Sequence, residues 1–165
     1  MAHDIQTIGQ HYANELIRDG MRLGIIHSIT GISRHTLREF SCTIHGQNCN
    51  QGGRQPDNTI AFVKAGQPLL ELSTAVAIFH CVESDSKSPM DAFVTTWRAV
   101  KLLREGTKPR LIDINAAWYA IRDVKAHLIL WKRCDVCKAN YISGDNLPKT
   151  DRNCPYCKTM SAAKI

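Results

Sequence analysis

The chain has 165 residues, a formal net charge of +6 and an apolar content of 44%, so it can bury a core as one domain or as one domain with a small appendage. No apolar run reaches the roughly eighteen residues of a membrane span, and the first ten residues lack the basic and apolar stretches of a secretory signal. Seven cysteines without an export signal predict a reducing cytoplasm.

Residues 1–44 predict three helices. The first carries an apolar face at steps of three and four and ends near Gly20. The second covers residues 21–28, and Ser33 is a good N-cap for the third. The residues expected to face inward are Ile5, Ile8, Tyr12, Leu16, Leu37 and Phe40.

Residues 21–44 fit a helix-turn-helix-like region, in which the second helix lies in the major groove of DNA. Gly31 supplies the positive φ that the turn needs, whereas His27 stands where a small side chain is usual. Arginine can grip phosphate or guanine, and threonine can touch phosphate or a thymine methyl. The alternative is an ordinary helical hairpin with a solvated basic face. The predicted DNA contacts are Ser33, Arg34, His35, Thr36 and Arg38.

A loop over residues 45–60 is predicted from its glycines, proline and amides. Three core helices are expected over residues 67–131, the first starting near Pro68, the second at Ser88-Pro89 and ending at Gly106. Their apolar stripes comprise Leu69, Leu72, Val76, Phe79 and Val82, then Phe93, Trp97, Val100 and Leu103, then Ile114, Trp118, Ile121, Val124 and Leu128.

Four cysteines form two Cys-x-x-Cys pairs, Cys134 with Cys137 and Cys154 with Cys157, sixteen residues apart. This spacing predicts one structural zinc ion held by four thiolates, with no open position for a catalytic water. Disulfides would need an oxidising compartment, and a thioredoxin-like pair would need a βαβ pattern that is not visible. We therefore expect a mainly α protein with a helical domain over residues 1–131 and a four-cysteine zinc-binding module over residues 132–165.

The zinc-binding module is also basic, and its predicted DNA contacts are Lys132, Arg133, Lys138, Lys149 and Arg152. Four thiolates and one Zn²⁺ together carry two negative charges, which brings the metallated chain to about +4. The module is equally compatible with a protein-docking role. No Walker loop, Gly-x-Ser-x-Gly or His-Glu-x-x-His motif is present, so an enzyme is not predicted.

Two blocks of the sequence resemble the family of the flagellar transcriptional activator subunit FlhC. They are ELIRDGMRLGIIHSITGISRHTL in the helical region, and AWYAIRDVKAHLILWKRCDVCKANYI followed by CPYC around the cysteines. The resemblance implies a mainly helical protein that binds zinc through the four cysteines. It also implies a hetero-oligomer with an FlhD-like subunit, which activates promoters together with RNA polymerase.

The chain departs from the flagellar members in the composition of the loop over residues 45–59 and in ending eight residues after Cys157. These departures favour a divergent member, such as those that switch on transfer genes of conjugative or integrative elements. The expected function is a cytoplasmic, zinc-stabilised DNA-binding subunit that activates flagellar or conjugative-transfer promoters. The alternative is a zinc-ribbon adaptor that binds only proteins.

Overall fold

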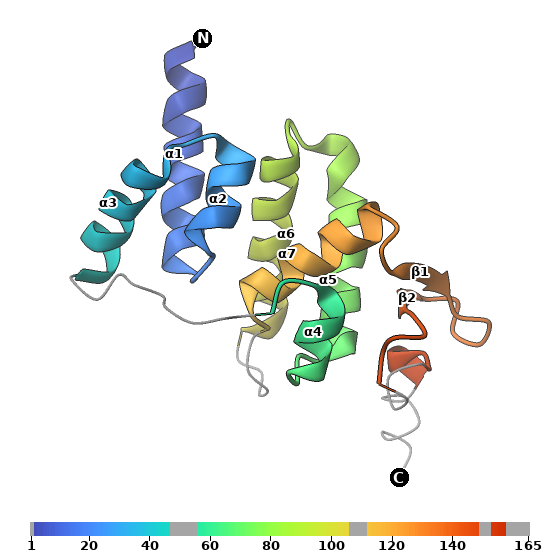
Figure 1. The fold of residues 1–165 in the computed structure, drawn as a ribbon. Coiled ribbons are helices and arrows are strands. Elements are labelled where there is room, and N and C mark those ends of the chain that lie inside the picture. The colour runs from blue at the N-terminus through green and yellow to red at the C-terminus, as the bar shows by residue number, and fades with distance from the viewer. Residues whose placement is uncertain (1, 47–55, 106–111, 149–152, 158–165) are drawn as a thin grey trace.

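The computed structural model describes residues 2–46, 56–105, 112–148 and 153–157, without the side chains of residues 2–8 and 104. The fold is mainly helical, as the sequence predicts, with one small sheet (Figure 1). The helices are α1 (Ala2–Arg18), α2 (Leu23–Thr30), α3 (Arg34–His45), α4 (Thr59–Lys64), α5 (Leu69–Val82), the short 3₁₀ helix η2 (Glu83–Asp85), α6 (Pro89–Arg104) and α7 (Ile114–Lys125).

Helices α1, α2 and α3 pack together at one end of the molecule (Figure 1). Gly20 ends the first helical run with φ +85°, and the amide of Met21 donates to the carbonyl of Leu16 at 2.9 Å. A bond of this kind reaches back over the last turn and satisfies a carbonyl that the ending helix leaves free. Leu16 and Leu37 are fully buried between these helices and the rest of the core.

Helices α5, α6 and α7 form the centre of the molecule, where α5 packs against both of the others. The predicted start of α6 is confirmed, because Pro89 is its first residue and the Ser88 hydroxyl accepts from the amide of Asp91. The apolar stripes of these helices supply most of the central core. The buried members are Leu69, Leu72, Val76, Phe79, Phe93, Trp97, Val100, Ile114, Ile121 and Val124.

Several expected boundaries differ from the structure. The loop predicted to reach residue 60 ends earlier, because Asn58 caps α4 by accepting from the amide of Ala61. The last core helix ends at Lys125 rather than 131, so Leu128 is 68% exposed instead of buried. Leu103 lies in the last turn of α6 and is 61% exposed, so its assignment to the core was also wrong. Gly106 and the side chains of Ile5 and Ile8 lie outside the described part.

The cysteine region is attached to the helical body by a two-stranded antiparallel sheet of β1 (Leu130–Arg133) and β2 (Asn140–Ser143). The amide of Ile142 in β2 donates to the buried hydroxyl of Ser73 in α5 at 3.1 Å. Ile129, Ile142 and Leu147 belong to the same core cluster as the central helices. The module is therefore anchored to the helical body by apolar side chains of its own.

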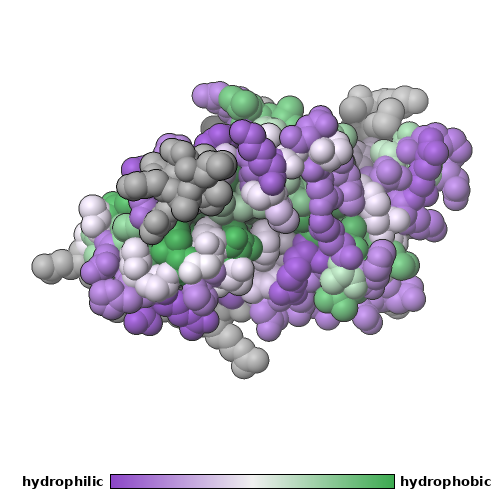
Figure 2. Space-filling model, turned by 90° about the horizontal axis from the view of Figure 1, so that it is seen from above, coloured by the Kyte–Doolittle hydropathy of each residue, from purple (hydrophilic) through white to green (hydrophobic). Residues whose placement is uncertain are grey.

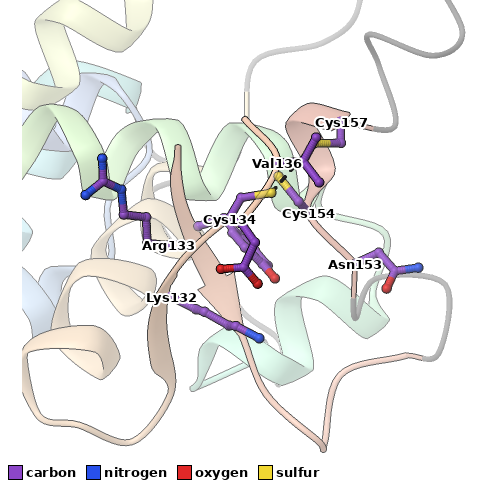
Figure 3. Close-up of a pocket in the computed structure, with 9 residues that line it drawn as sticks. Lys132, Arg133, Cys134, Val136, Asn153, Cys154 and Cys157 are labelled. Carbon is purple, nitrogen blue, oxygen red and sulfur yellow. Dashed lines mark hydrogen bonds between the residues drawn. The ribbon is translucent and has the colours of Figure 1, made fainter. Parts of the chain in front are cut away.

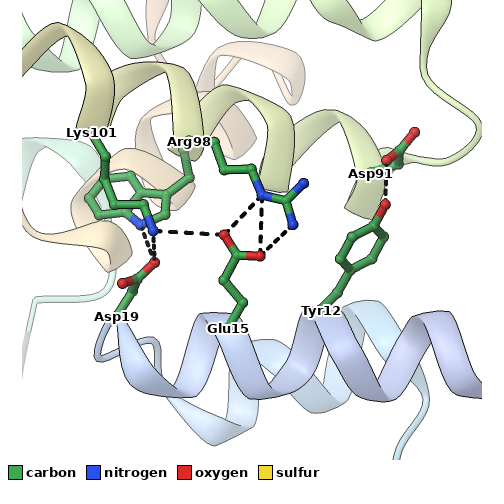
Figure 4. Close-up of polar contacts among 7 residues, drawn as sticks. Tyr12, Glu15, Asp19, Asp91, Arg98 and Lys101 are labelled. Atoms are coloured by element: carbon green, nitrogen blue, oxygen red, sulfur yellow. Dashed lines mark hydrogen bonds and ion pairs between the residues drawn. The ribbon is translucent and has the colours of Figure 1, made fainter.

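A polar seam joins α1 to α6 (Figure 4). The guanidinium of Arg98 binds the carboxylate of Glu15 through both Nε and Nη2, with distances of 2.5 to 3.2 Å. Asp19 accepts from the indole of Trp97 at 2.8 Å and from Lys101 at 2.6 Å. The seam continues in a bond from the Tyr12 hydroxyl to Asp91 at 2.7 Å. These contacts join the first helical group to the centre of the molecule.

Hydrophilic residues cover most of the face seen in Figure 2, and apolar residues show between them in small separate areas. Within the described ranges, no helix combines the length and hydrophobicity needed to cross a bilayer.

Candidate metal centre and nucleic-acid interface

The structure brings together the four cysteines that the sequence singled out. Their sulfur atoms all lie within 4.8 Å of one another. The Cys134 and Cys157 sulfurs are 3.7 Å apart, and the Cys137 and Cys154 sulfurs are 3.6 Å apart. One pair follows β1 and the other lies in the segment 153–157, whose last three residues are helical, so the chain folds back on itself to close the cluster.

This arrangement fits a metal ion with tetrahedral coordination. A zinc–sulfur bond of about 2.3 Å in a tetrahedron places neighbouring sulfurs about 3.8 Å apart, close to the separations seen here. The donor set consists of four soft sulfur atoms, and no fifth ligand from the described residues joins the group. The four cysteines can therefore hold one metal ion with every position filled by protein.

The thiols of Cys134, Cys154 and Cys157 differ in pKa because their surroundings differ. The backbone amides of Cys137 and Val136 lower the pKa of the Cys134 thiol to about 6. Hydrogen bonds with the neighbouring sulfurs, that of Cys137 first, raise the pKa of Cys157 to about 12. Burial raises the pKa of Cys154. The Cys134 sulfur is thus prepared to bind as a thiolate, and a bound cation would favour loss of the protons from Cys154 and Cys157.

A pocket of about 560 Å³ opens beside the cluster (Figure 3). Its lining comprises Lys132, Arg133, Cys134, Asp135, Val136, Tyr141, Asn153, Cys154 and Cys157. Val136, which lies between the first two cysteines, is 83% exposed. Leu128 and Leu130, which precede the module, are 68% and 62% exposed.

The helix-turn-helix-like region has the turn and the cap that its sequence predicts, but its first helix is Leu23–Thr30 rather than residues 21–28. Gly31 adopts φ +71° between α2 and α3, and the Ser33 hydroxyl caps α3 by accepting from the amide of Thr36 at 3.1 Å. The Ser33 and Thr36 hydroxyls also bond each other at 2.8 Å. Both hydroxyls are engaged locally, and the His35 ring lies 3.7 Å from the carboxylate of Glu39 on the same helix. The exposed cations of α3 that remain to reach outward are Arg34 and Arg38.

The two groups of predicted DNA contacts are not brought together. Helix α3 and the β1–β2 sheet lie on opposite sides of the central helices (Figure 1). Lys132 and Arg133 are exposed on β1, and Lys138 is exposed in the turn that follows, where its ammonium donates to the carbonyl of Asp135 at 2.6 Å. Lys149 and Arg152 lie outside the described residues.

With this geometry established, comparison with known proteins identifies the family. The model of the family described as flagellar transcriptional activator (FlhC) matches residues 2–165. The chain belongs to the FlhC family. A flagellar transcriptional regulator FlhC of Yersinia enterocolitica is similar to it, with 24% identity over 155 residues that cover 93% of this chain and 80% of the relative.

Membership of the FlhC family confirms the resemblance seen in the two sequence blocks. The family is one of transcriptional activators of flagellar genes, which is not a class of enzyme. The four-cysteine cluster lies in the matched region and fits a metal-binding role within a regulator of this kind.

Sequence reasoning missed several residues around these sites. Sequence reasoning expected Leu128 to be buried and did not mark it as exposed, because its exposure depends on where α7 ends. The role of His27 was also missed: its Nδ1 atom lies 2.8 Å from the carbonyl oxygen of Ile32. The available signal was its position at the turn of the predicted helix-turn-helix-like region.

Proposed function

We propose that this FlhC-family chain is the zinc-stabilised, DNA-binding subunit of a cytoplasmic transcriptional activator. In this proposal α3 contacts the major groove, zinc bound by Cys134, Cys137, Cys154 and Cys157 shapes the C-terminal module, and an FlhD-like subunit completes a hetero-oligomer. The complex recruits RNA polymerase to flagellar promoters or, in an element-borne member, to conjugative-transfer promoters.

The observation that carries the proposal is the α2–turn–α3 unit inside a family of transcriptional activators. Its turn has the positive φ at Gly31, its second helix is capped, and exposed cations stand on that helix. Arg34 and Arg38 have no carboxylate partner among the ion pairs of the described residues. Unpaired arginines on a presented helix are suited to phosphates and guanine edges.

Lys132, Arg133 and Lys138 are a second candidate contact for DNA. Their three positive charges are partly offset by Asp135 and, with zinc bound, by the two negative charges of the tetrathiolate centre. The positive potential around the pocket is consequently weak. We therefore assign α3 the main part in DNA binding and the module a minor part.

Mobility-shift titration of the full chain at two salt concentrations, with and without the FlhD-like subunit, tests the proposal. We expect DNA affinity to fall steeply with salt, because phosphate contacts release counterions. Arg38→Ala should weaken binding roughly ten-fold, whereas Lys64→Ala, which removes an exposed cation on α4, should leave it unchanged. If Arg34→Ala and Arg38→Ala both bind DNA as tightly as Lys64→Ala does, α3 is not the DNA-binding surface.

The second candidate function is a zinc-ribbon adaptor that binds only proteins. The exposed Val136 at the pocket favours it, since an exposed apolar side chain suits a protein surface better than a phosphate backbone. An adaptor of this kind would retard no DNA fragment in either form of the titration.

A further inference from the structure

Two side chains of α2, His27 and Thr30, form hydrogen bonds to the backbone of Ile32 in the turn that leads into α3. His27 Nδ1 lies 2.8 Å from the Ile32 carbonyl oxygen. The Ile32 amide donates to the Thr30 hydroxyl at 3.2 Å, and that hydroxyl donates in turn to the carbonyl of Ile26 at 2.7 Å. Both polar groups of the Ile32 backbone are therefore bound to the preceding helix.

His27 binds the turn through its backbone as well as through its ring. Its carbonyl accepts from the amide of Gly31 at 2.9 Å, which closes the left-handed end of α2. A carbonyl oxygen only accepts hydrogen bonds, so the ring nitrogen facing Ile32 must carry the proton. This explains how a large side chain fits where a helix-turn-helix usually has a small one: the ring bonds the turn instead of separating the helices.

The consequence of these bonds lies in α3. Ser33, the cap of α3, directly follows the residue that His27 holds, and Leu37 is fully buried one turn later. The start of α3 and its inward face are thus both anchored, which sets the direction in which Arg34 and Arg38 project. Recognition of base edges tolerates errors of only about 0.5 Å in such placement.

We propose that His27 is a positioning residue for DNA recognition, whose Nδ1–H bond to Ile32 sets the orientation of α3. The inference rests on the proposed function, because it assumes that α3 is the helix that reads DNA. It goes further in assigning a role in recognition to a half-buried residue on the neighbouring helix.

The test compares His27→Ala, which removes the donor, with His27→Gln, whose side-chain amide can donate to the same carbonyl. The probe is the duplex of about 20 base pairs that the wild-type complex enriches from a randomised library, measured beside an unrelated duplex of equal length. We expect His27→Ala to lose roughly ten-fold in affinity for the enriched duplex and little for the unrelated one. His27→Gln should restore most of the loss, and His11→Ala, which removes an exposed histidine of α1, should change neither.

The outcomes separate this inference from the proposed function. If Arg38→Ala weakens binding while His27→Ala discriminates between the duplexes as well as the wild type does, the positioning role is wrong and α3 remains the DNA-binding helix. If neither Arg34→Ala nor Arg38→Ala weakens binding, the proposed function itself fails.

If His27→Ala does not fold, a measurement on the unmodified protein can still test the inference. Long-range proton–nitrogen NMR of the histidine rings reports which nitrogen carries the proton. We expect the neutral His27 ring to be protonated at Nδ1, and a ring protonated only at Nε2 would overturn the inference.

Discussion

Asp123 shows how one buried carboxylate can organise the chain around it. Its Oδ2 atom accepts from both the amide and the hydroxyl of Thr59 at 2.8 Å, and its Oδ1 atom accepts from Arg122. Thr59 is the first residue of α4 and is fully buried. The carboxylate thereby fixes the start of α4 against α7.

Replacing Asp123 with alanine should lower the free energy of unfolding by about 3 kcal/mol, because two buried donors on Thr59 and the guanidinium of Arg122 lose their acceptor. Urea titration followed by far-ultraviolet circular dichroism measures the change. Asp85→Ala removes an exposed carboxylate from η2 and should cost less than about 0.5 kcal/mol. Similar losses in the two variants would contradict the role given to Asp123.

At the scale of helices and strands, the sequence predicted the elements whose signals are local. The apolar stripes and the caps at Ser33 and Ser88 marked α3 and α6 correctly, since spacing and capping act within one or two turns. The four-cysteine cluster was predictable for the same reason, because each Cys-x-x-Cys pair is contained in one turn.

What the sequence did not reveal depends on distant contacts. Helix α7 ends at Lys125 without a glycine: His127 takes φ +55°, and the Leu128 amide returns to the carbonyl of Asp123 at 2.8 Å. The apolar spacing continues past this point, so a prediction from periodicity alone made the helix too long. Helix α4 was missed because its stability depends on Asp123, 64 residues from Thr59.

The left-handed turn between α2 and α3 supplies a prediction with a matched control. Gly31 has φ +71°, and a Cβ added there would meet no neighbouring atom within 4 Å, so alanine would suffer only backbone strain. We expect Gly31→Ala to destabilise the protein by about 1 kcal/mol. Gly24 also has open space around it but lies within α2, so Gly24→Ala should be stabilising by up to about 1 kcal/mol. Thermal unfolding of the two variants should therefore move in opposite directions.

The seam between α1 and α6 should respond to acid. The bond from Arg98 holds the pKa of Glu15 below its ordinary value of 4.5, and the Tyr12 hydroxyl, followed by the Lys87 amide, lowers the pKa of Asp91. A carboxylate whose pKa is lower in the folded state stabilises the protein above its unfolded-state pKa. That stabilisation disappears as the pH falls through the folded-state pKa.

We therefore expect the difference in unfolding free energy between the wild type and Glu15→Gln to be largest above about pH 5 and to shrink towards pH 3. Its size should stay at or below about 1 kcal/mol, because Arg98 is 45% exposed. Urea titrations across this range measure it. A difference that grows on acidification would mean that the Glu15 pairing does not stabilise the folded state.

At the scale of the whole molecule, the C-terminal module is stabilised in two ways, by its cysteine cluster and by packing of its sheet against the helices. The cysteine cluster has only Tyr141, Tyr156 and the cysteines themselves in its own apolar group among the described residues. The sheet beside it, by contrast, is anchored to α5 through Ile142 and Ser73, and Trp131 contacts His80 with ring centroids 5.7 Å apart. Loss of metal should therefore destabilise the segment around the cysteines more than the sheet that is anchored to α5.

Cys137→Ser should remove the metal and release the segment at residues 153–157, while the helical body keeps its fold. A single thiolate lost from a four-sulfur site leaves an incomplete tetrahedron, and metal binding supplies much of the folding energy of such a site. Elemental analysis should find about one zinc per wild-type chain and none in the variant. Amide hydrogen exchange should increase at residues 153–157 and change little in α5 and α6. Cys81→Ser, which alters an exposed cysteine of α5, serves as the control and should retain the metal. A Cys137 variant that keeps a full equivalent of zinc would show that the metal lies elsewhere, and faster exchange throughout the central helices would show that it stabilises the whole fold.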